Sequence, residues 1–146
     1  MSTSAVSDIW FRRPDLVEAN RWQSSTIAGP LGIAITEIGD DFLRGSMPVD
    51  SRTHQPMGIL HGGASVVLAE SLGSLAANYC VDTSTHYCVG LDVNANHLRA
   101  VRSGSVTGTA RPIHLGKSTQ VWDIRIIDDH ARDVCIARLT MAVLSR

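Results

Sequence analysis

The sequence predicts an α+β protein in which an antiparallel sheet of about six strands packs around one long helix. Several stretches alternate apolar and polar residues, which is the period of half-buried strands. One stretch, residues 63–79, is apolar or small on almost every side, which is typical of a helix buried on most of its circumference. The strands come in groups and do not alternate with helices, and this order favours an antiparallel sheet.

The N-terminal part, residues 1–30, is expected to form an arm that contains one short helix. Pro14 precedes residues 15–23, where apolar residues recur at helical spacing, so the helix is predicted there. Gly29 and Pro30 follow and are expected to end regular structure before the sheet begins.

Residues 32–38 and 42–49 are predicted to form the first hairpin of the sheet. Both segments carry strand-like residues, and the turn-forming sequence Gly-Asp-Asp at 39–41 separates them. Residues 50–62 are rich in turn formers and are predicted to be a loop that leads into the long helix. Further strands are predicted at 87–98, 105–112, 118–128 and 133–144.

Size and composition fit a small soluble domain. The chain has 146 residues, which suits a single domain spanning residues 1–146. Its formal net charge is -1 and its pI is about 6.6, which argues against a broad nucleic-acid-binding surface. The 3 cysteines show no CxxC spacing and are interpreted as reduced thiols of a cytoplasmic protein. The first residues lack a signal-peptide core, and no apolar run reaches the ~20 residues that span a membrane.

The long helix contains one residue that its apolar surroundings do not explain, which is Glu70. An unpaired buried carboxylate costs several kcal/mol or more. Ser74 follows at i+4, and Gly63 and Val67 lie on the same face toward the N-terminus. One stripe of the helix therefore carries a carboxylate, a hydroxyl and bare backbone. A lone glutamate in a helix is more often solvated or paired with an arginine, so the functional interpretation rests on the combination.

The helix is preceded by His61, Gly62 and Gly63. The first N–H groups of a helix have no partner within it, and the helix dipole is positive there. Glycines allow a ligand to approach the backbone closely. The N–H groups of Gly62 and Gly63 are therefore predicted to face a developing oxyanion. The alternative interpretation is a tight turn before a packed helix.

His61 and Glu70 are too far apart to act on one carbonyl within a single chain. About nine helical residues at ~1.5 Å each separate them by roughly 12–14 Å. If both act on the same bond, two chains must lie antiparallel, with one helix start against the middle of the other. A symmetric dimer makes this pairing twice, so we expect two sites, each built from both subunits.

The segment HGGASVVLAES at 61–71, preceded by Gln55, resembles the hotdog-fold acyl-CoA thioesterases. The similar subgroup contains the Glu-type 4-hydroxybenzoyl-CoA thioesterase, the 1,4-dihydroxy-2-naphthoyl-CoA thioesterase and the enterobactin-pathway proofreading thioesterase. Other similar segments are MPVDSRTHQP, VGLDVNANHLR, HLGKSTQVWDIRI and IARLTMAVL, so the resemblance runs from about residue 31 to 144. It implies a hotdog fold, in which the sheet wraps around the helix at 63–79.

The resemblance also implies a role for each site residue. Glu70 would attack the thioester as a nucleophile or activate water as a base, and Ser74 would hold the water or the acyl group. The N–H of Gly62 from the partner chain would polarise the carbonyl, while Gln55 and His61 would orient the carbonyl and the water. The implied reaction is hydrolysis of an acyl-CoA, with an aromatic acyl group favoured, and it needs no cofactor and no metal.

Several further residues are expected to contact the substrate. The acyl group is expected beside Met57, Leu60, Val67 and Leu68. The CoA phosphates need cationic side chains or unpaired N–H groups. His97 is assigned to the site, although a structural histidine bonded to the backbone is the alternative. The candidate contacts are Gly63, Met57, Val67, His97, Arg99, His114, Gly116, Lys117 and Ser118.

Other hydrolase classes lack their motifs in this sequence. There is no GxSxG for a serine hydrolase, and there is no HExxH or i, i+4 histidine pair for a metal hydrolase. A hotdog hydratase or dehydratase and a non-catalytic acyl-CoA-binding protein stay open as alternatives. The resemblance implies a homodimer at least, and a homotetramer made of two dimers. Acyl-carrier-protein thioesters share the pantetheine arm and are a second candidate substrate class.

Overall fold

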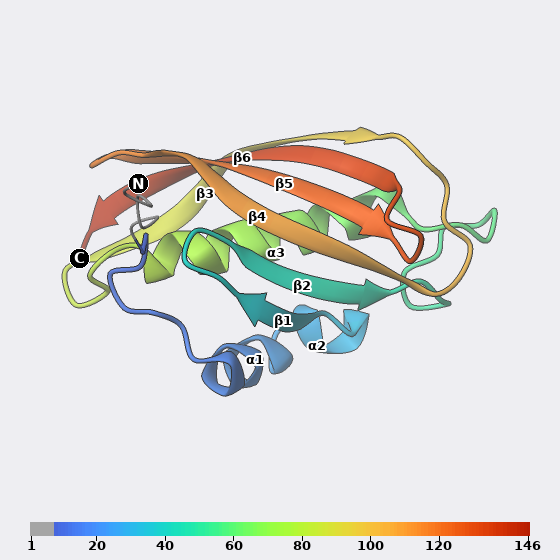
Figure 1. Cartoon of the computed structure of the whole chain (residues 1–146), viewed down its shortest axis with the longest axis horizontal. Helices are drawn as coiled ribbons and strands as arrows, with labels where there is room; N and C mark the ends of the chain where they lie inside the picture. Colours follow the sequence, from blue (N-terminus) through green and yellow to red (C-terminus); the bar gives the residue numbers. More distant parts are fainter. Residues whose placement is uncertain (1–7) are drawn as a thin grey trace, which may run out of the picture.

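A 6-stranded antiparallel sheet curves around one long helix in the computed structural model, which describes residues 8–146 (Figure 1). The strand order across the sheet is β1-β2-β4-β5-β6-β3. The predicted α+β class is therefore confirmed. The prediction of an N-terminal arm includes residues 1–7, which lie outside the described residues. The elements are α1 (Leu16–Ser24), α2 (Ala28–Leu31), β1 (Ala34–Ile38), β2 (Leu43–Pro48), α3 (Gly62–Tyr79), β3 (His86–His97), β4 (Ser105–Leu115), β5 (Thr119–Asp128) and β6 (Asp133–Ser145).

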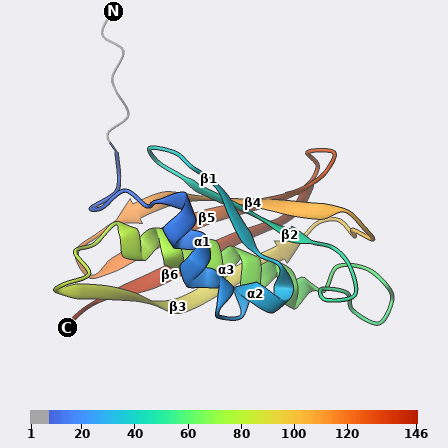
Figure 2. The same ribbon diagram turned by 90° about the horizontal axis from the view of Figure 1, so that it is seen from below.

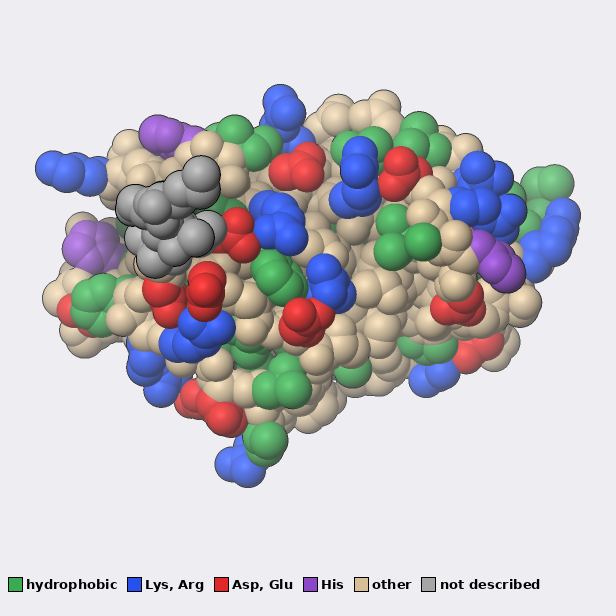
Figure 3. Space-filling model, in the orientation of Figure 1, with side chains coloured by type: hydrophobic (Ala, Val, Ile, Leu, Met, Phe, Trp, Pro, Cys, Tyr) green, Lys and Arg blue, Asp and Glu red, His purple; other side chains and the backbone are tan. Residues whose placement is uncertain are grey.

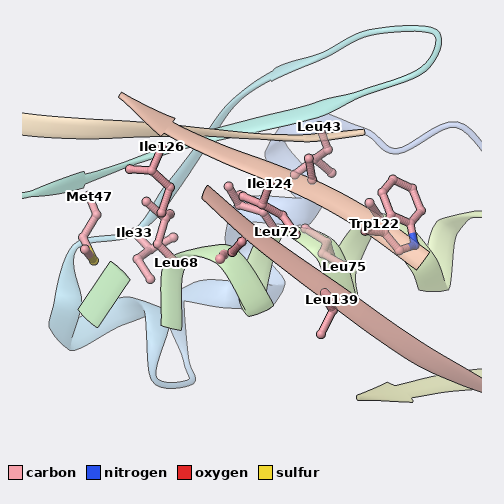
Figure 4. Packing of buried hydrophobic residues seen from close by; sticks show 14 of the residues in the cluster. Ile33, Leu43, Met47, Leu68, Leu72, Leu75, Trp122, Ile124, Ile126 and Leu139 are labelled. Atoms are coloured by element: carbon pink, nitrogen blue, oxygen red, sulfur yellow. The ribbon is translucent and has the colours of Figure 1, made fainter. Parts of the chain in front are cut away.

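Helix α3 is buried because its apolar side chains face the concave side of the sheet. Leu68 and Leu72 are fully buried, and Figure 4 shows them near Ile124 and Ile126 of β5. Burial of each such side chain stabilises the fold by roughly 1.5–3 kcal/mol. Leu68 is thus part of the core of a single chain. The expectation that Leu68 lines the acyl pocket is wrong for this reason.

Two glycines of the sheet make room for α3. A Cβ atom on Gly45 would lie 2.7 Å from Cδ2 of Leu72, and one on Gly108 would lie 2.8 Å from Cδ1 of the same leucine. A larger residue at either position would push the helix away from β2 or β4. The close approach of α3 explains why glycine, which weakens a strand, stands inside both of these strands.

Strand β3 forms one edge of the sheet. It pairs with β6 along its length, and in the part of the chain that the structure describes no strand pairs with its other side. Val89 and Leu91 on this strand are exposed. A long edge strand with apolar side chains offers a surface on which a further strand can pair.

The short helices α1 and α2 of the N-terminal arm lie alongside α3, as the view from below shows (Figure 2). Asn20 of α1 fastens the arm to the sheet, because its Nδ2 donates to the Ile35 carbonyl at 2.9 Å and its Oδ1 accepts from the Ile35 N–H at 2.8 Å. The predicted helix at 15–23 is confirmed. Asp15 is its N-cap and accepts a hydrogen bond from the Glu18 N–H.

Two predicted boundaries are wrong. Gly29 and Pro30 do not end regular structure, since both belong to the short helix α2. A proline in the first turn needs no N–H donor, and Gly32 closes the helix with a left-handed φ of 70°. Strand β4 continues beyond Pro112, because a bulge between Pro112 and His114 accommodates the proline in the ladder.

Acidic and basic side chains are interspersed on the face of the molecule that Figure 3 shows. This distribution agrees with the formal net charge of -1. Among residues 8–146, the helices are all too short or too polar to cross a membrane.

Candidate active site

The imidazole of His61 closes the N-terminus of α3. His61 is the N-cap residue, and its Nδ1 accepts a hydrogen bond of 2.8 Å from the Gly63 N–H. An Nδ1 that accepts carries no proton, so the neutral ring in this arrangement has its proton on Nε2. The ring is exposed. It therefore offers an Nε2–H donor at the start of the helix.

Of the two glycines at the helix start, Gly62 keeps its N–H open. The Gly63 N–H is taken by the His61 cap, so the expectation that it faces a ligand is wrong. Within residues 8–146 the Gly62 N–H has no hydrogen-bond acceptor. A Cβ atom on Gly62 would lie 2.9 Å from Nε2 of His97, so glycine lets that imidazole approach the helix start. Gly62 is the candidate oxyanion donor at the positive end of the helix dipole.

Gln55 lies in a tight turn that fixes its side-chain amide. Its Oε1 accepts a hydrogen bond from the Met57 N–H. Its own main chain bonds to Ile59 and Gly58, each at 2.9 Å. Because the amide oxygen faces a backbone N–H, the Nε2 group remains as a donor. Met57 is 79% exposed at the tip of this turn, where an apolar side chain has little to contact within its own chain.

Gln55, Gly62, His97 and Arg99 share one cavity of about 410 Å³, which we call the helix-start cavity. The loop after β2, the first turn of α3 and the end of β3 form its walls. The structure thus brings together site residues that were predicted from separate segments. The rest of the lining consists of Ile59, Leu60, Ser65, Leu98, Ala100 and Val134.

Glu70 lines a second and larger hollow of about 560 Å³, which we call the Glu70 groove. Helix α3 contributes Val67, Glu70 and Ser74 from the predicted stripe. The N-terminal arm forms the opposite wall with Trp22 and Ile27, which are 63% and 60% exposed. The other lining residues are Gln23, Ser25, Thr26, Ser71, Leu75 and Asn78.

The Glu70 carboxylate makes no hydrogen bond or ion pair with any other group of residues 8–146. Ser74, one turn further along α3, donates its hydroxyl to Sδ of Met141 at 3.7 Å and not to Glu70. The carboxylate oxygens of Glu70 therefore keep their lone pairs for a water molecule or an electrophilic carbon.

The two hollows lie at different positions along α3. Gly62 and Glu70 are about eight residues apart, which is ~12 Å along a helix axis. The linings of the two hollows have no residue in common. One chain therefore does not place the Gly62 N–H and the Glu70 carboxylate on the same carbonyl, which agrees with the distance argument from the sequence.

The predicted CoA contacts on the β4–β5 hairpin lie far from the helix-start cavity. The Ser118 carbonyl accepts a hydrogen bond from the Val143 N–H near the end of β6, whereas His97 pairs with Cys135 near the start of β6. Eight strand residues at ~3.3 Å each separate these points by about 26 Å. A single chain does not unite this hairpin with the end of β3. The hairpin contacts are His114, Gly116, Lys117 and Ser118.

The cysteines do not supply a nucleophile. Burial raises the pKa of the Cys80 thiol to about 12, and it also raises the pKa values of Cys88 and Cys135. A thiol whose pKa is raised stays protonated and attacks carbonyls poorly. Glu70 is therefore the candidate group for attack on a carbonyl or for activation of water.

The sequence profile of the thioesterase superfamily matches residues 57–135. The chain belongs to this superfamily. The thioesterase is 50% identical to the 1,4-dihydroxy-2-naphthoyl-CoA hydrolase of Escherichia coli, over 93% of this chain and 99% of that protein. It is 46% identical to the proofreading thioesterase EntH of Cronobacter sakazakii, over 93% of this chain and 98% of that protein.

A solved structure agrees with this assignment. A glutamine-to-alanine variant of a thioesterase from Pseudomonas aeruginosa superposes with a TM-score of 0.93 and is 60% identical, covering 94% of this chain and 99% of that chain. The hotdog fold predicted from the resemblance is confirmed. The predicted enzyme class is confirmed as well, and this thioesterase is a hydrolase of thioester bonds.

Trp22 and Ile27 line the Glu70 groove of the thioesterase, and neither residue was predicted from the sequence to belong to the site. No pattern in the sequence pairs the N-terminal arm with the helix at 63–79. One signal was present, because Trp22 is a large aromatic residue in the short helix predicted at residues 15–23. A large aromatic side chain on the open face of a helix is typical of a binding surface.

Proposed function

We propose that this thioesterase hydrolyses an aromatic acyl-CoA to the free acid and CoA, with Glu70 as the catalytic carboxylate. The observation that carries the proposal is the Glu70 groove, in which a carboxylate without a partner in residues 8–146 faces an arm that carries Trp22. A hollow of about 560 Å³ has the size of a small-molecule site. Aromatic rings pack favourably on an indole. The Escherichia coli relative is named for a naphthoyl thioester, which supports the same substrate class.

Glu70 can act by either of two routes in this proposal. As a nucleophile, its oxygen attacks the thioester carbon, and the C–S bond breaks to release the CoA thiolate and leave an anhydride that water hydrolyses. As a general base, it takes a proton from the water whose oxygen attacks the same carbon. Both routes consume one water and yield the acid and the CoA thiol. The thiolate leaves readily, so neither route needs a strong general acid.

The helix-start groups would stabilise the oxyanion that forms on either route. The Gly62 N–H lacks an acceptor in residues 8–146, and the amide of Gln55 is oriented with its Nε2 as a donor. His61 offers an Nε2–H for the carbonyl or the water. One such donor typically contributes about 10²–10³-fold to turnover. Ser74 would hold the water or the acyl group within the Glu70 groove.

We place each site between two chains, because Gly62 and Glu70 are ~12 Å apart within one chain. The exposed edge of β3 supports this arrangement. Antiparallel pairing of β3 with a second copy would run the two α3 helices in opposite directions, with the start of one beside the middle of the other. The proposal includes a homodimer as the minimum unit and a homotetramer made of two such dimers.

The CoA moiety would bind across subunits as well. Arg99 and His97 line the helix-start cavity, where a cationic side chain can pair with phosphate. Lys117 and its hairpin neighbours would reach the nucleotide from another subunit, because they lie far from Arg99 in their own chain. A carrier-protein thioester presents the same pantetheine arm and is the second substrate class. The free cysteines suit the cytoplasmic location that we include in the proposal.

The test of this proposal is thiol release from benzoyl, hydroxybenzoyl, dihydroxynaphthoyl and aliphatic acyl-CoAs. Wild type should hydrolyse the aromatic esters fastest, and Glu70→Gln should lose about 10³-fold or more, because an amide neither attacks nor accepts a proton. Glu37→Gln is the matched control, since Glu37 is a surface carboxylate of β1 paired with Arg44. Wild-type turnover by Glu70→Gln would remove the role of Glu70.

A single turnover in ¹⁸O-labelled water identifies the nucleophile route when the label enters the enzyme. On that route, water that attacks the Glu70 carboxyl carbon of the anhydride leaves the label on Glu70, and the first acid carries an unlabelled oxygen from Glu70. On the general-base route, and after attack at the acyl carbon of the anhydride, the first acid carries the label. Mass spectrometry of the acid and of the peptide containing Glu70 reads both outcomes.

A further inference from the structure

We propose that Gly90 of β3 is a positioning residue that holds the carboxylate of Glu70 in its working direction. The inference rests on the proposed function of Glu70 and adds a residue outside both hollows. A Cβ atom on Gly90 would lie 2.6 Å from Oε1 of Glu70 and 3.7 Å from its carboxyl carbon. The carboxylate thus occupies the space in which any other residue would have its side chain.

The backbone of β3 does not itself require glycine at this position. In residues 8–146 the glycines with a left-handed φ are Gly32, Gly58 and Gly104, and Gly90 is not among them. Gly90 pairs with Met141 of β6 at the edge of a bulge. An alanine is compatible with such a strand and would strengthen it. A side chain at this position would therefore collide with the Glu70 carboxylate and is not opposed by the backbone conformation.

Gly90 differs from the other strand glycines that face α3. At Gly45 and Gly108 the space is filled by Leu72, which is a core side chain. At Gly90 it is filled by a carboxylate oxygen that makes no hydrogen bond with any described residue. The first two glycines serve packing of the core, whereas the third sets the direction of a reactive group.

Asn78 keeps the distance between α3 and β3 fixed near this contact. Its Nδ2 donates to the carbonyls of Ser74 and Cys88 at 2.9 and 3.2 Å, and its Oδ1 accepts from the Cys88 N–H at 2.8 Å. Cys88 lies just before Gly90 on the same strand. The helix and the strand cannot separate here without breaking the two bonds to Cys88, so a methyl group on Gly90 must displace the Glu70 side chain.

The test is the substitution Gly90→Ala, measured in the wild-type and in the Glu70→Asp backgrounds. In the wild-type background kcat should fall about 10- to 100-fold, because a displacement near 1 Å disturbs the attack geometry. KM should change less than about twofold, since no binding group is altered.

In the Glu70→Asp background, the aspartate carboxylate is one methylene shorter and withdraws from the new methyl group. In that background Gly90→Ala should cost less than about threefold. Equal losses in both backgrounds, or an unchanged kcat, overturn the inference.

A stability measurement covers the case in which Gly90→Ala folds poorly. Gly90→Ala should lower the midpoint temperature of thermal unfolding. Most of this decrease should disappear when Glu70→Ala is added, because the colliding carboxylate is then absent. The same loss with and without Glu70 would show that the collision lies elsewhere and would end the inference.

Two controls distinguish displacement of Glu70 from a change in subunit association and from failure of the proposed function. Val89→Ala alters the neighbouring position, whose side chain lies on the opposite face of the sheet, and should keep kcat within about twofold. A loss as large as that of Gly90→Ala would assign the effect to the strand edge. Light scattering must give the same mass for all variants. Full activity of Glu70→Gln would remove the proposed function, whereas an inactive Glu70→Gln with an unaffected Gly90→Ala would remove only this inference.

Discussion

The start and the middle of α3 hold their functional groups in opposite ways. At the start, the local main chain fixes each group by hydrogen bonds, with the Gly63 N–H on His61 and the Met57 N–H on Gln55. In the middle, Glu70 has no such bond in the described chain and lies against Gly90 and the groove walls. Donors that must keep one direction are fixed by bonds. A carboxylate that must attack keeps its lone pairs unoccupied and is directed by packing.

After Glu70→Gln, the largest loss of kcat is expected from removal of the Gly62 N–H. Gly62→Pro should lower kcat about 10²–10³-fold, because proline has no N–H for the oxyanion. The first helical position tolerates proline, so the fold should persist. Gly62→Ala is the matched control, since it adds a Cβ against His97 but keeps the N–H. Steady-state kinetics with equal losses for both variants would assign the effect to the His97 contact.

Mixed dimers test whether the two ends of α3 work across a subunit interface. Glu70→Gln and Gly62→Pro chains are each expected to be inactive alone. A hybrid dimer would have one intact site, with Glu70 from one chain and Gly62 from the other. Random mixing after refolding should restore about a quarter of wild-type activity. Hybrids confirmed by mass spectrometry that stay inactive would place both groups in one chain or outside the site.

Removal of the Trp22 side chain from the wall of the Glu70 groove should change the selectivity for the acyl group more than the rate of the catalytic step. Trp22→Ala should lower the preference for aromatic over aliphatic acyl-CoA about 5-fold in kcat/KM, since an aromatic pair contributes around 1 kcal/mol. Val17→Ala is the control, because Val17 is an exposed residue of the same helix that does not line the groove. An equal loss with both substrate types would show that Trp22 supports the arm and does not select the acyl group.

Asn78 is expected to stabilise the fold where α3 packs against β3. Asn78→Ala leaves the Cys88 N–H and carbonyl without their bonds and should lower the free energy of unfolding by about 1–3 kcal/mol. Asn78→Asp keeps the acceptor for the Cys88 N–H and should lose less. Urea unfolding of the three proteins measures the difference. If Asn78→Asp were less stable than Asn78→Ala, the stabilising role of the hydrogen bonds between Asn78 and Cys88 would be contradicted.

The smallest effect concerns the loop that carries Gln55. Hydrogen bonds from Arg52 lower the pKa of Asp50 to about 2, against an ordinary value of 3.8. Because folding lowers the pKa of Asp50, its ionised carboxylate stabilises the folded state above about pH 4. This stabilisation is lost as the pH falls toward 2. The difference in thermal midpoint between wild type and Asp50→Asn should therefore narrow over this range. Because both side chains are exposed, the change should be small. A constant difference would contradict the assigned pair.

The sheet and α3 could be predicted because burial determines their pattern. The central strands β2, β4, β5 and β6 alternate between the core and the surface over much of their length, and α3 is apolar where the sheet covers it. Pro112 stopped the prediction of β4 too early, since a bulge is a property of two strands and not of one. Gly29 and Pro30 suggested a break where α2 forms, because proline signals both a stop and a first turn.

The site was predictable where residue type carried the signal. Glu70 stands out in an apolar helix, and the helix length indicated that the helix start and Glu70 do not meet within one chain, which agrees with Gly62 and Glu70 lining separate hollows. The roles of these residues stay predictions. The sequence did not reveal which helix-start N–H the His61 side chain would take, and so Gly63 was misjudged. It also did not reveal the wall at Trp22, because contact between the arm and α3 depends on tertiary packing alone.

The wall and the carboxylate of the Glu70 groove belong to different parts of the chain. Trp22 and Ile27 come from an arm outside the sheet, whereas Glu70 is embedded in the element that organises the core. Trp22 and Ile27 have exposed side chains outside the core, so substitutions at these two positions are expected to change the groove wall and to leave Glu70 in place. Enzymes with this arrangement can change their acyl-group selectivity while they keep the same catalytic residues. A mutant library confined to the groove wall at Trp22 and Ile27 is therefore the shortest route to a new substrate.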